Sequence, residues 1–65
     1  MSELETMLIS VLRVGMEMRA AQARYFKSPR DSDERRDALR QSVSLERKFD
    51  AMAATALRRV EEPPA

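Results

Sequence analysis

The fold is decided by one short stretch, KSPRDSDERR, which spans Lys27 to Arg36. Pro29 disfavours helical geometry at the residue before it, so a helix that reaches this stretch must end by Ser28. Asp31 or Ser32 can then cap a second helix, and the two acidic residues that follow Ser32 complement the positive end of its dipole. The stretch therefore predicts a single turn between two helices.

Helix-forming residues dominate on both sides of this turn, where the only glycine is Gly15. The opening SELE fits a capping box, with Ser2 as the N-cap and Glu5 reaching back to it. A connection of about four residues requires neighbouring helices to run antiparallel. We expect an all-α hairpin over residues 1–60, with helices at about 3–27 and 32–60, a turn at 28–31 and a flexible tail at 61–65.

The first helix carries two apolar stripes, and a single partner helix covers only one of them. The first stripe has the heptad spacing of a coiled-coil seam: Leu4, Met7, Val11, Val14, Met18, Ala21 and Tyr25. The second consists of Ile9, Leu12, Met16, Ala23 and Phe26. We therefore expect a homo-oligomer, in its simplest form a dimer that makes a four-helix bundle. Gly15, in mid-helix, predicts the close approach of another helix.

Composition also favours self-association. A chain of 65 residues buries a thin core, and with no Cys and no His it has neither disulfides nor the usual soft metal sites to support it. Lys and Arg number 12 against 11 Asp and Glu, so the net charge of +1 does not point to nucleic acid. Arg13 interrupts the first apolar run, which excludes a signal sequence or a membrane span there. We expect a cytoplasmic protein that does not enter a membrane.

Polar residues interrupt the apolar pattern of both helices. In the first helix these are Arg19 and Gln22, and in the second they are Ser42, Glu46 and Asp50, whose i, i+4, i+8 spacing predicts a stack on the core-facing side. One interpretation is a buried network that fixes helix register, within a chain or across the oligomer. A second is a pocket for an anionic ligand, to which Arg19 and Gln22 offer donors and Tyr25 and Phe26 offer aromatic faces. A third is that these residues are simply exposed, because the helical phase drifts along the chain.

The second helix also carries a basic stripe on its predicted outer side. Its members are Arg36, Arg40, Arg47, Lys48, Arg58 and Arg59. Such a stripe is either a solvated helix face or a surface for an acidic protein, an anionic ligand or nucleic-acid phosphate.

Enzymatic function is not expected. Without His or Cys the chain lacks a catalytic triad, a thiol nucleophile and a zinc-water site, and it has no glycine-rich phosphate loop. Glu46 and Asp50 lie on one helix and lack the opposed geometry of a glycosidase pair. We predict no catalytic residues, no metal and no cofactor.

Two segments, MRAAQARYF at Met18–Phe26 and LRQSVSLERKFD at Leu39–Asp50, carry a resemblance. The chain resembles a family of small uncharacterised helical-hairpin proteins from phages and mobile elements, with the pattern MRxxQxxYF, a turn, and LxxSxxLExxxD. The resemblance implies a phage or mobile-element origin, hence the host cytoplasm, and no particular mechanism.

The leading hypothesis is a non-enzymatic, homo-oligomeric protein-interaction module that acts on a host or phage protein. The alternative is an oligomer that binds or sequesters an anionic, nucleotide-like ligand. A weak nucleic-acid binder is a third hypothesis, and nucleic acid is not the partner we expect.

Overall fold

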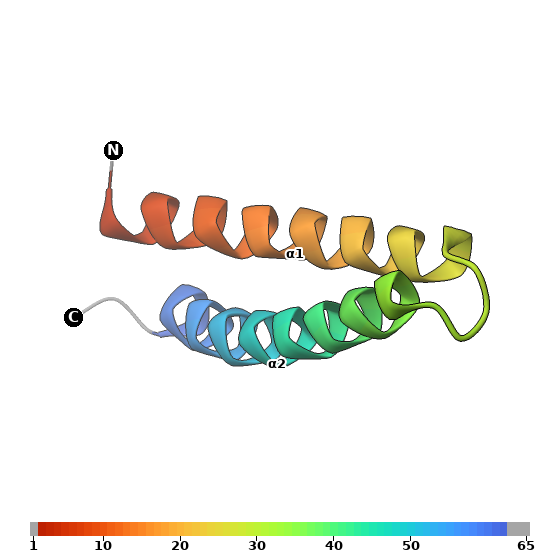
Figure 1. Ribbon diagram of the computed structural model, residues 1–65. Helices are drawn as coiled ribbons and strands as arrows, with labels where there is room; N and C mark the ends of the chain where they lie inside the picture. Colours follow the sequence, from red (N-terminus) through yellow and green to blue (C-terminus); the bar gives the residue numbers. More distant parts are fainter. Residues whose placement is uncertain (1, 63–65) are drawn as a thin grey trace.

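The computed structural model describes residues 2–62 and shows an all-α hairpin. Helix α1 spans Glu3–Lys27 and helix α2 spans Asp33–Glu61, and the two lie side by side and antiparallel (Figure 1). The predicted two-helix hairpin is therefore confirmed. Glu61, predicted to belong to a flexible tail, is the last residue of α2, and Glu62 is its C-cap. The rest of that predicted tail, 63–65, lies outside the described residues.

Side-chain caps define three of the four helix ends. Ser2 and Glu5 form the expected capping box, in which the Glu5 amide donates to the Ser2 Oγ over 3.1 Å. At the other end of α1, the Ser28 hydroxyl donates to the Arg24 carbonyl at 2.6 Å. Ser32, rather than Asp31, caps α2, because its Oγ accepts the amide of Arg35 at 3.1 Å. These caps satisfy backbone groups that a helix end leaves unpaired.

The turn holds one residue in the left-handed region. Asp31 has φ 61°, a conformation that Asp tolerates better than most side chains. The Ser32 hydroxyl donates to the Pro29 carbonyl at 2.7 Å, and this hydrogen bond links the two ends of the turn. The reversal that KSPRDSDERR predicts is thus made by one proline, one strained aspartate and one capping serine.

The core is a single seam between the helices, and it is thin. The first predicted stripe, from Leu4 to Tyr25, is buried or half-buried along its whole length, which confirms the heptad reading of α1. The fully buried positions are small: Val11, Val14 and Ala21 on α1, and Ala38, Ser42 and Ala56 on α2. No large side chain among residues 2–62 is completely buried. One hairpin alone therefore removes little apolar surface from water.

Gly15 is in close contact with α2, as its mid-helix position predicts. A Cβ atom built on Gly15 would stand 3.2 Å from Cε2 of the Phe49 ring. The ring of Phe49 thus packs directly on the α1 backbone.

Neither described helix is long and apolar enough to cross a membrane.

Candidate functional site

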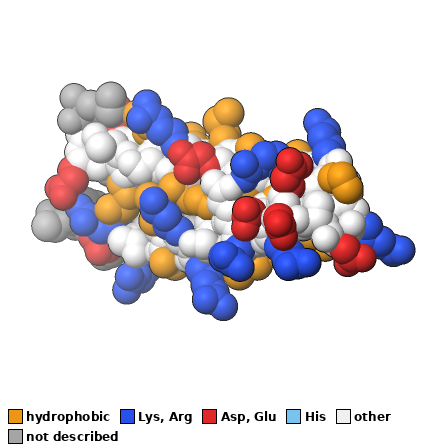
Figure 2. All heavy atoms as spheres, in the orientation of Figure 1, with side chains coloured by type: hydrophobic (Ala, Val, Ile, Leu, Met, Phe, Trp, Pro, Cys, Tyr) orange, Lys and Arg blue, Asp and Glu red, His pale blue; other side chains and the backbone are white. Residues whose placement is uncertain are grey.

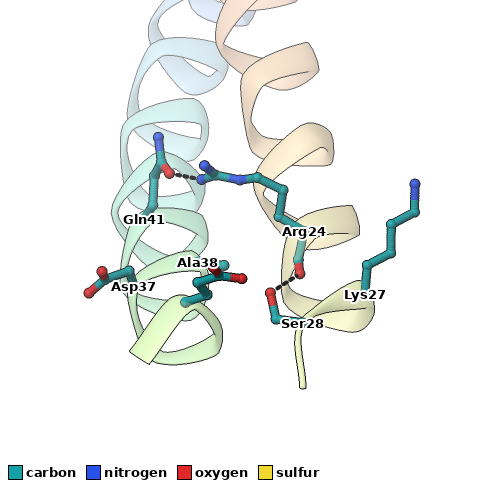
Figure 3. A pocket seen from close by; sticks show the side chains of 7 residues that line it. Arg24, Lys27, Ser28, Asp37, Ala38 and Gln41 are labelled. Carbon is teal, nitrogen blue, oxygen red and sulfur yellow. Dashed lines mark hydrogen bonds between the residues drawn. The ribbon is translucent and has the colours of Figure 1, made fainter. Parts of the chain in front are cut away.

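The hairpin has two broad faces, one on each side of the seam, and they differ in chemistry. We call one the polar face. It is the side on which Arg24 of α1 reaches across and donates to Oε1 of Gln41 on α2 (Figure 3). Side chains of both charges lie over both helices in Figure 2, and hydrophobic atoms show mainly between the helices. This face is suited to water.

The same side of the hairpin has a different surface toward the chain termini, where its lining is mostly apolar. Ser10 lies two heptads before Arg24, and with Thr6 it lines a shallow groove whose α2 wall includes Ala51 and Thr55. The opposite side of the hairpin, across the seam from Ser10 and Arg24, is the second face. We call it the apolar face.

The apolar face gathers nearly all the exposed large hydrophobic side chains of the described residues. Leu12 and Phe26, two heptads apart on α1, are 67% and 76% exposed. The exposed apolar members of this face are Leu8, Leu12, Phe26, Leu39, Val43, Leu57 and Val60, with Met16 at its α1 edge. Of the second stripe predicted for α1, Leu12, Met16, Ala23 and Phe26 are therefore left exposed, whereas Ile9 is half-buried.

An open groove of about 440 Å³ runs along the α1 half of this face. Leu12, Met16 and Arg19 line it on α1, and the ring of Phe49 lines it from α2 over Gly15. Its lining is mostly apolar, so the groove is suited to hydrophobic groups rather than to a hydrated ligand.

The structure separates the polar residues that the sequence pattern placed inward. Ser42 is buried and donates to the Leu39 carbonyl at 2.9 Å, so it is satisfied within its own helix. Gln22 is half-buried, whereas Arg19, Glu46 and Asp50 are exposed. The expectation that Glu46 and Asp50 face the seam is wrong for the single hairpin.

Helix geometry explains this error. Each step of four residues advances about 40° around a helix of 3.6 residues per turn, so three positions at i, i+4, i+8 do not stack. Starting from Ser42 in the seam, Glu46 and Asp50 rotate progressively onto the apolar face. Asp50 shares the heptad position of Val43 and Leu57, and Glu46 shares that of Leu39 and Val60. Arg19, Glu46 and Asp50 therefore interrupt the exposed apolar surface and not the core.

Tyr25 and Phe26 lie at the turn end of α1. Tyr25 is half-buried, and its ring packs edge to face on that of Phe26, with 5.3 Å between the centroids. The guanidinium of Arg35 lies over the Tyr25 ring, 4.2 Å from its centroid. A hollow of about 310 Å³ adjoins this cluster and is lined by Tyr25, Arg30, Asp31, Ser32, Arg35, Arg36 and Leu39. The hollow contains the aromatic part of the predicted pocket but neither Arg19 nor Gln22.

The predicted basic residues are exposed but do not form one narrow stripe. Arg40 and Arg47, one heptad apart, lie on the outer side of α2, whereas Arg58 falls on the polar-face side and Arg36 on the apolar-face side. A straight-helix projection hides this spread, because the seam follows a period of 3.5 residues. Arg36 pairs with Asp33 and Arg59 with Glu3, each at 3.8 Å and largely in solvent. Lys48 is likewise exposed.

Sequence reasoning missed two cross-helix contacts. The sequence pattern places Arg35 in the second helix but assigns it no contact, although it lies one heptad before Ser42 and therefore starts the seam of α2. Its Nη1 also donates to the Ser28 carbonyl at 3.4 Å. The Arg24–Gln41 bond could not be found without the register between the helices.

The chain matches no protein-family model, no curated protein and no solved structure. The resemblance to phage and mobile-element hairpins thus stays a prediction, and function must be inferred from the surface itself. Among residues 2–62 no three acidic side chains gather where they could hold a metal ion.

Proposed function

We propose that this protein is a non-enzymatic interaction module, a homo-oligomer of hairpins that dock by their apolar faces and bind another protein through the surface left outside. The observation that carries the proposal is the exposure of Leu12, Phe26 and their neighbours on one side of the seam. Contiguous exposed apolar surface on a small domain marks an interaction site.

The thin seam supports the same proposal. A chain of this length gains little stability from one layer of small buried residues, and the sequence has no cysteine for a disulfide. Docking of two hairpins would cover the second stripe of α1 and give the chain a second layer of core. The resulting four-helix bundle is the simplest closed arrangement.

Sedimentation equilibrium over a range of micromolar concentrations tests the self-association. We expect a mass of at least two chains, with circular dichroism showing two full helices under the same conditions. A helical protein with the mass of one chain throughout that range would contradict the proposal.

The outer side of α2 would remain exposed in such a bundle. Arg40 and Arg47 lie there, and they suit an acidic surface on a protein partner, which the resemblance to phage proteins suggests is a host protein. Affinity capture with the wild-type chain and with the double variant Arg40→Glu, Arg47→Glu tests this. We expect a partner that the variant no longer retains although its oligomer size is unchanged.

The hollow at the turn favours a second candidate function, binding of an anionic small ligand. Arg30, Arg35 and Arg36 line it beside the Tyr25 ring, together with Asp31. A ligand that binds only the folded state raises its melting temperature. A thermal shift with one class of nucleotide, reduced by Arg30→Ala, is the expected result. No shift across mononucleotides, dinucleotides and cyclic nucleotides would contradict it.

A further inference from the structure

The apolar face carries three charged side chains whose positions along the hairpin are related. Gly15 lies opposite Phe49 and Arg24 opposite Gln41, so Arg19, midway between them on α1, lies at the height of Leu45 and Glu46 on α2. Asp50 lies one turn from Glu46 on the same flank of α2. Arg19 on α1 and Glu46 on α2 therefore share one level of the apolar face, and Asp50 lies one helical turn away.

These three groups have no charged partner within the hairpin. Among residues 2–62, Arg19, Glu46 and Asp50 make no ion pair and no side-chain hydrogen bond, and all three are exposed. Covering the face with an apolar partner would leave each charge buried and unpaired, which is very costly. The occupant of this face must therefore supply an acid opposite Arg19 and a base opposite Glu46 and Asp50.

A second copy of this chain supplies both. If the twofold axis runs parallel to the helices, α1 of each copy lies on α2 of the other. Each residue then has the same position along the axis in both copies. Arg19 of one copy then faces Glu46 of the second copy, with Asp50 of the second copy one turn away. A planar guanidinium with five donors can bridge two carboxylates spaced in this way.

The other face-to-face arrangement conflicts with these charges. A twofold axis perpendicular to the helices would place α2 on α2, crossing near the middle of that helix, which spans residues 33–61. Glu46 and Asp50 flank this midpoint, so the carboxylates of both copies would meet within an apolar interface. Like charges held together in this way oppose association by several kcal/mol.

The face is also large enough for a stable dimer. The hairpin measures 53 × 19 × 12 Å between Cα atoms, so a broad face projects over roughly 1,000 Å². A typical stable interface buries about 800 Å² per partner. We propose that two copies dock by their apolar faces with α1 on α2, and that Arg19 of each copy pairs with Glu46 and Asp50 of the other. This inference rests on the proposed self-association and specifies its arrangement.

Charge exchange between two variants tests the pairing. One variant is Arg19→Glu and the other is the double variant Glu46→Arg, Asp50→Arg. Each alone places like charges opposite each other, and we expect its dimer dissociation constant to rise at least about a hundredfold. Mixed together, the two have complementary charges at both pairing sites, so a heterodimer should form. The triple variant Arg19→Glu, Glu46→Arg, Asp50→Arg should form a homodimer again.

Native mass spectrometry distinguishes the species when one variant carries a mass tag, and circular dichroism reports whether each variant is helical. Arg40→Glu is the matched control, because Arg40 lies on the outer side of α2 and its reversal should leave the dimer unchanged. A wild-type chain that is monomeric would overturn the self-association and this inference together. A wild-type dimer that Arg19→Glu does not weaken, or a mixture that yields no heterodimer, would overturn the pairing alone.

Discussion

The two broad faces of this hairpin are built on the same two helices and share one seam, yet they differ in whether their side chains have partners within the hairpin. On the polar face Arg24 bonds Gln41 across the seam, and the charged groups around this bond are exposed. On the apolar face Leu12 and Phe26 are mostly exposed, and the charges among them have no partner within the hairpin. The difference supports the proposed docking of hairpins by their apolar faces.

The largest expected effect is that of a charge introduced into the apolar face. Leu12→Glu should raise the dimer dissociation constant at least about a hundredfold, because a buried unpaired carboxylate is disfavoured by several kcal/mol. Ala20→Glu places the same charge on the exposed, opposite flank of α1 and should not change the dimer. Sedimentation equilibrium compares the two. Equal association of both variants would mean that the faces do not differ in function.

The next effect belongs to the seam, which both faces share. Ala21 is 1% exposed, so Ala21→Leu would force the helices apart and should lower the free energy of unfolding by about 1–3 kcal/mol. Ala20→Leu adds the same atoms one residue away in solvent and should have little effect. Urea unfolding followed by circular dichroism measures both. If Ala21→Leu were stabilising, the seam would be looser than the structure shows.

A smaller effect is expected at the turn, which belongs to neither face. Ser32→Ala removes the cap of α2 and its bond to the Pro29 carbonyl, so it should lower the free energy of unfolding by about 1 kcal/mol. Ser44→Ala, at an exposed position within α2, is the matched control. The dimer mass at high concentration should be unchanged by either substitution. A loss of association in Ser32→Ala alone would show that the turn contributes to the interface.

Sequence alone predicted the fold because its signals are local. Pro29 ends one helix, Ser32 starts the next, and a short connection leaves antiparallel packing as the outcome. The heptad stripe from Leu4 to Tyr25 also identified the side of α1 that meets α2. The uncovered stripe through Leu12 and Phe26 followed from the same periodicity. Each of these predictions depends on residues within a few turns of one another.

The side chains of the candidate site were harder to place, since their positions depend on small angles accumulated along a helix. Ser42 and Asp50 differ by only two steps of four residues, yet the first is buried and the second exposed. The basic residues from Arg36 to Arg59 spread for the same reason, because the helices wrap with a period of 3.5 residues. Register across the seam, which brings Arg24 to Gln41, appears in no local pattern.

The smallest expected effect compares one arginine from each face. Arg24→Met removes a solvent-exposed bond on the polar face, so the free energy of unfolding should change by no more than about 0.5 kcal/mol. Arg19→Met makes the same substitution on the apolar face, where it would leave Glu46 and Asp50 of the second copy without their cation. Thermal unfolding at a concentration that maintains the dimer should therefore show a clear loss for Arg19→Met and almost none for Arg24→Met. Since the side chains exchanged are identical, a larger loss for Arg19→Met would support a partner that covers the apolar face. Equal melting temperatures would mean that Arg19 meets water in the oligomer, as it does in the single hairpin.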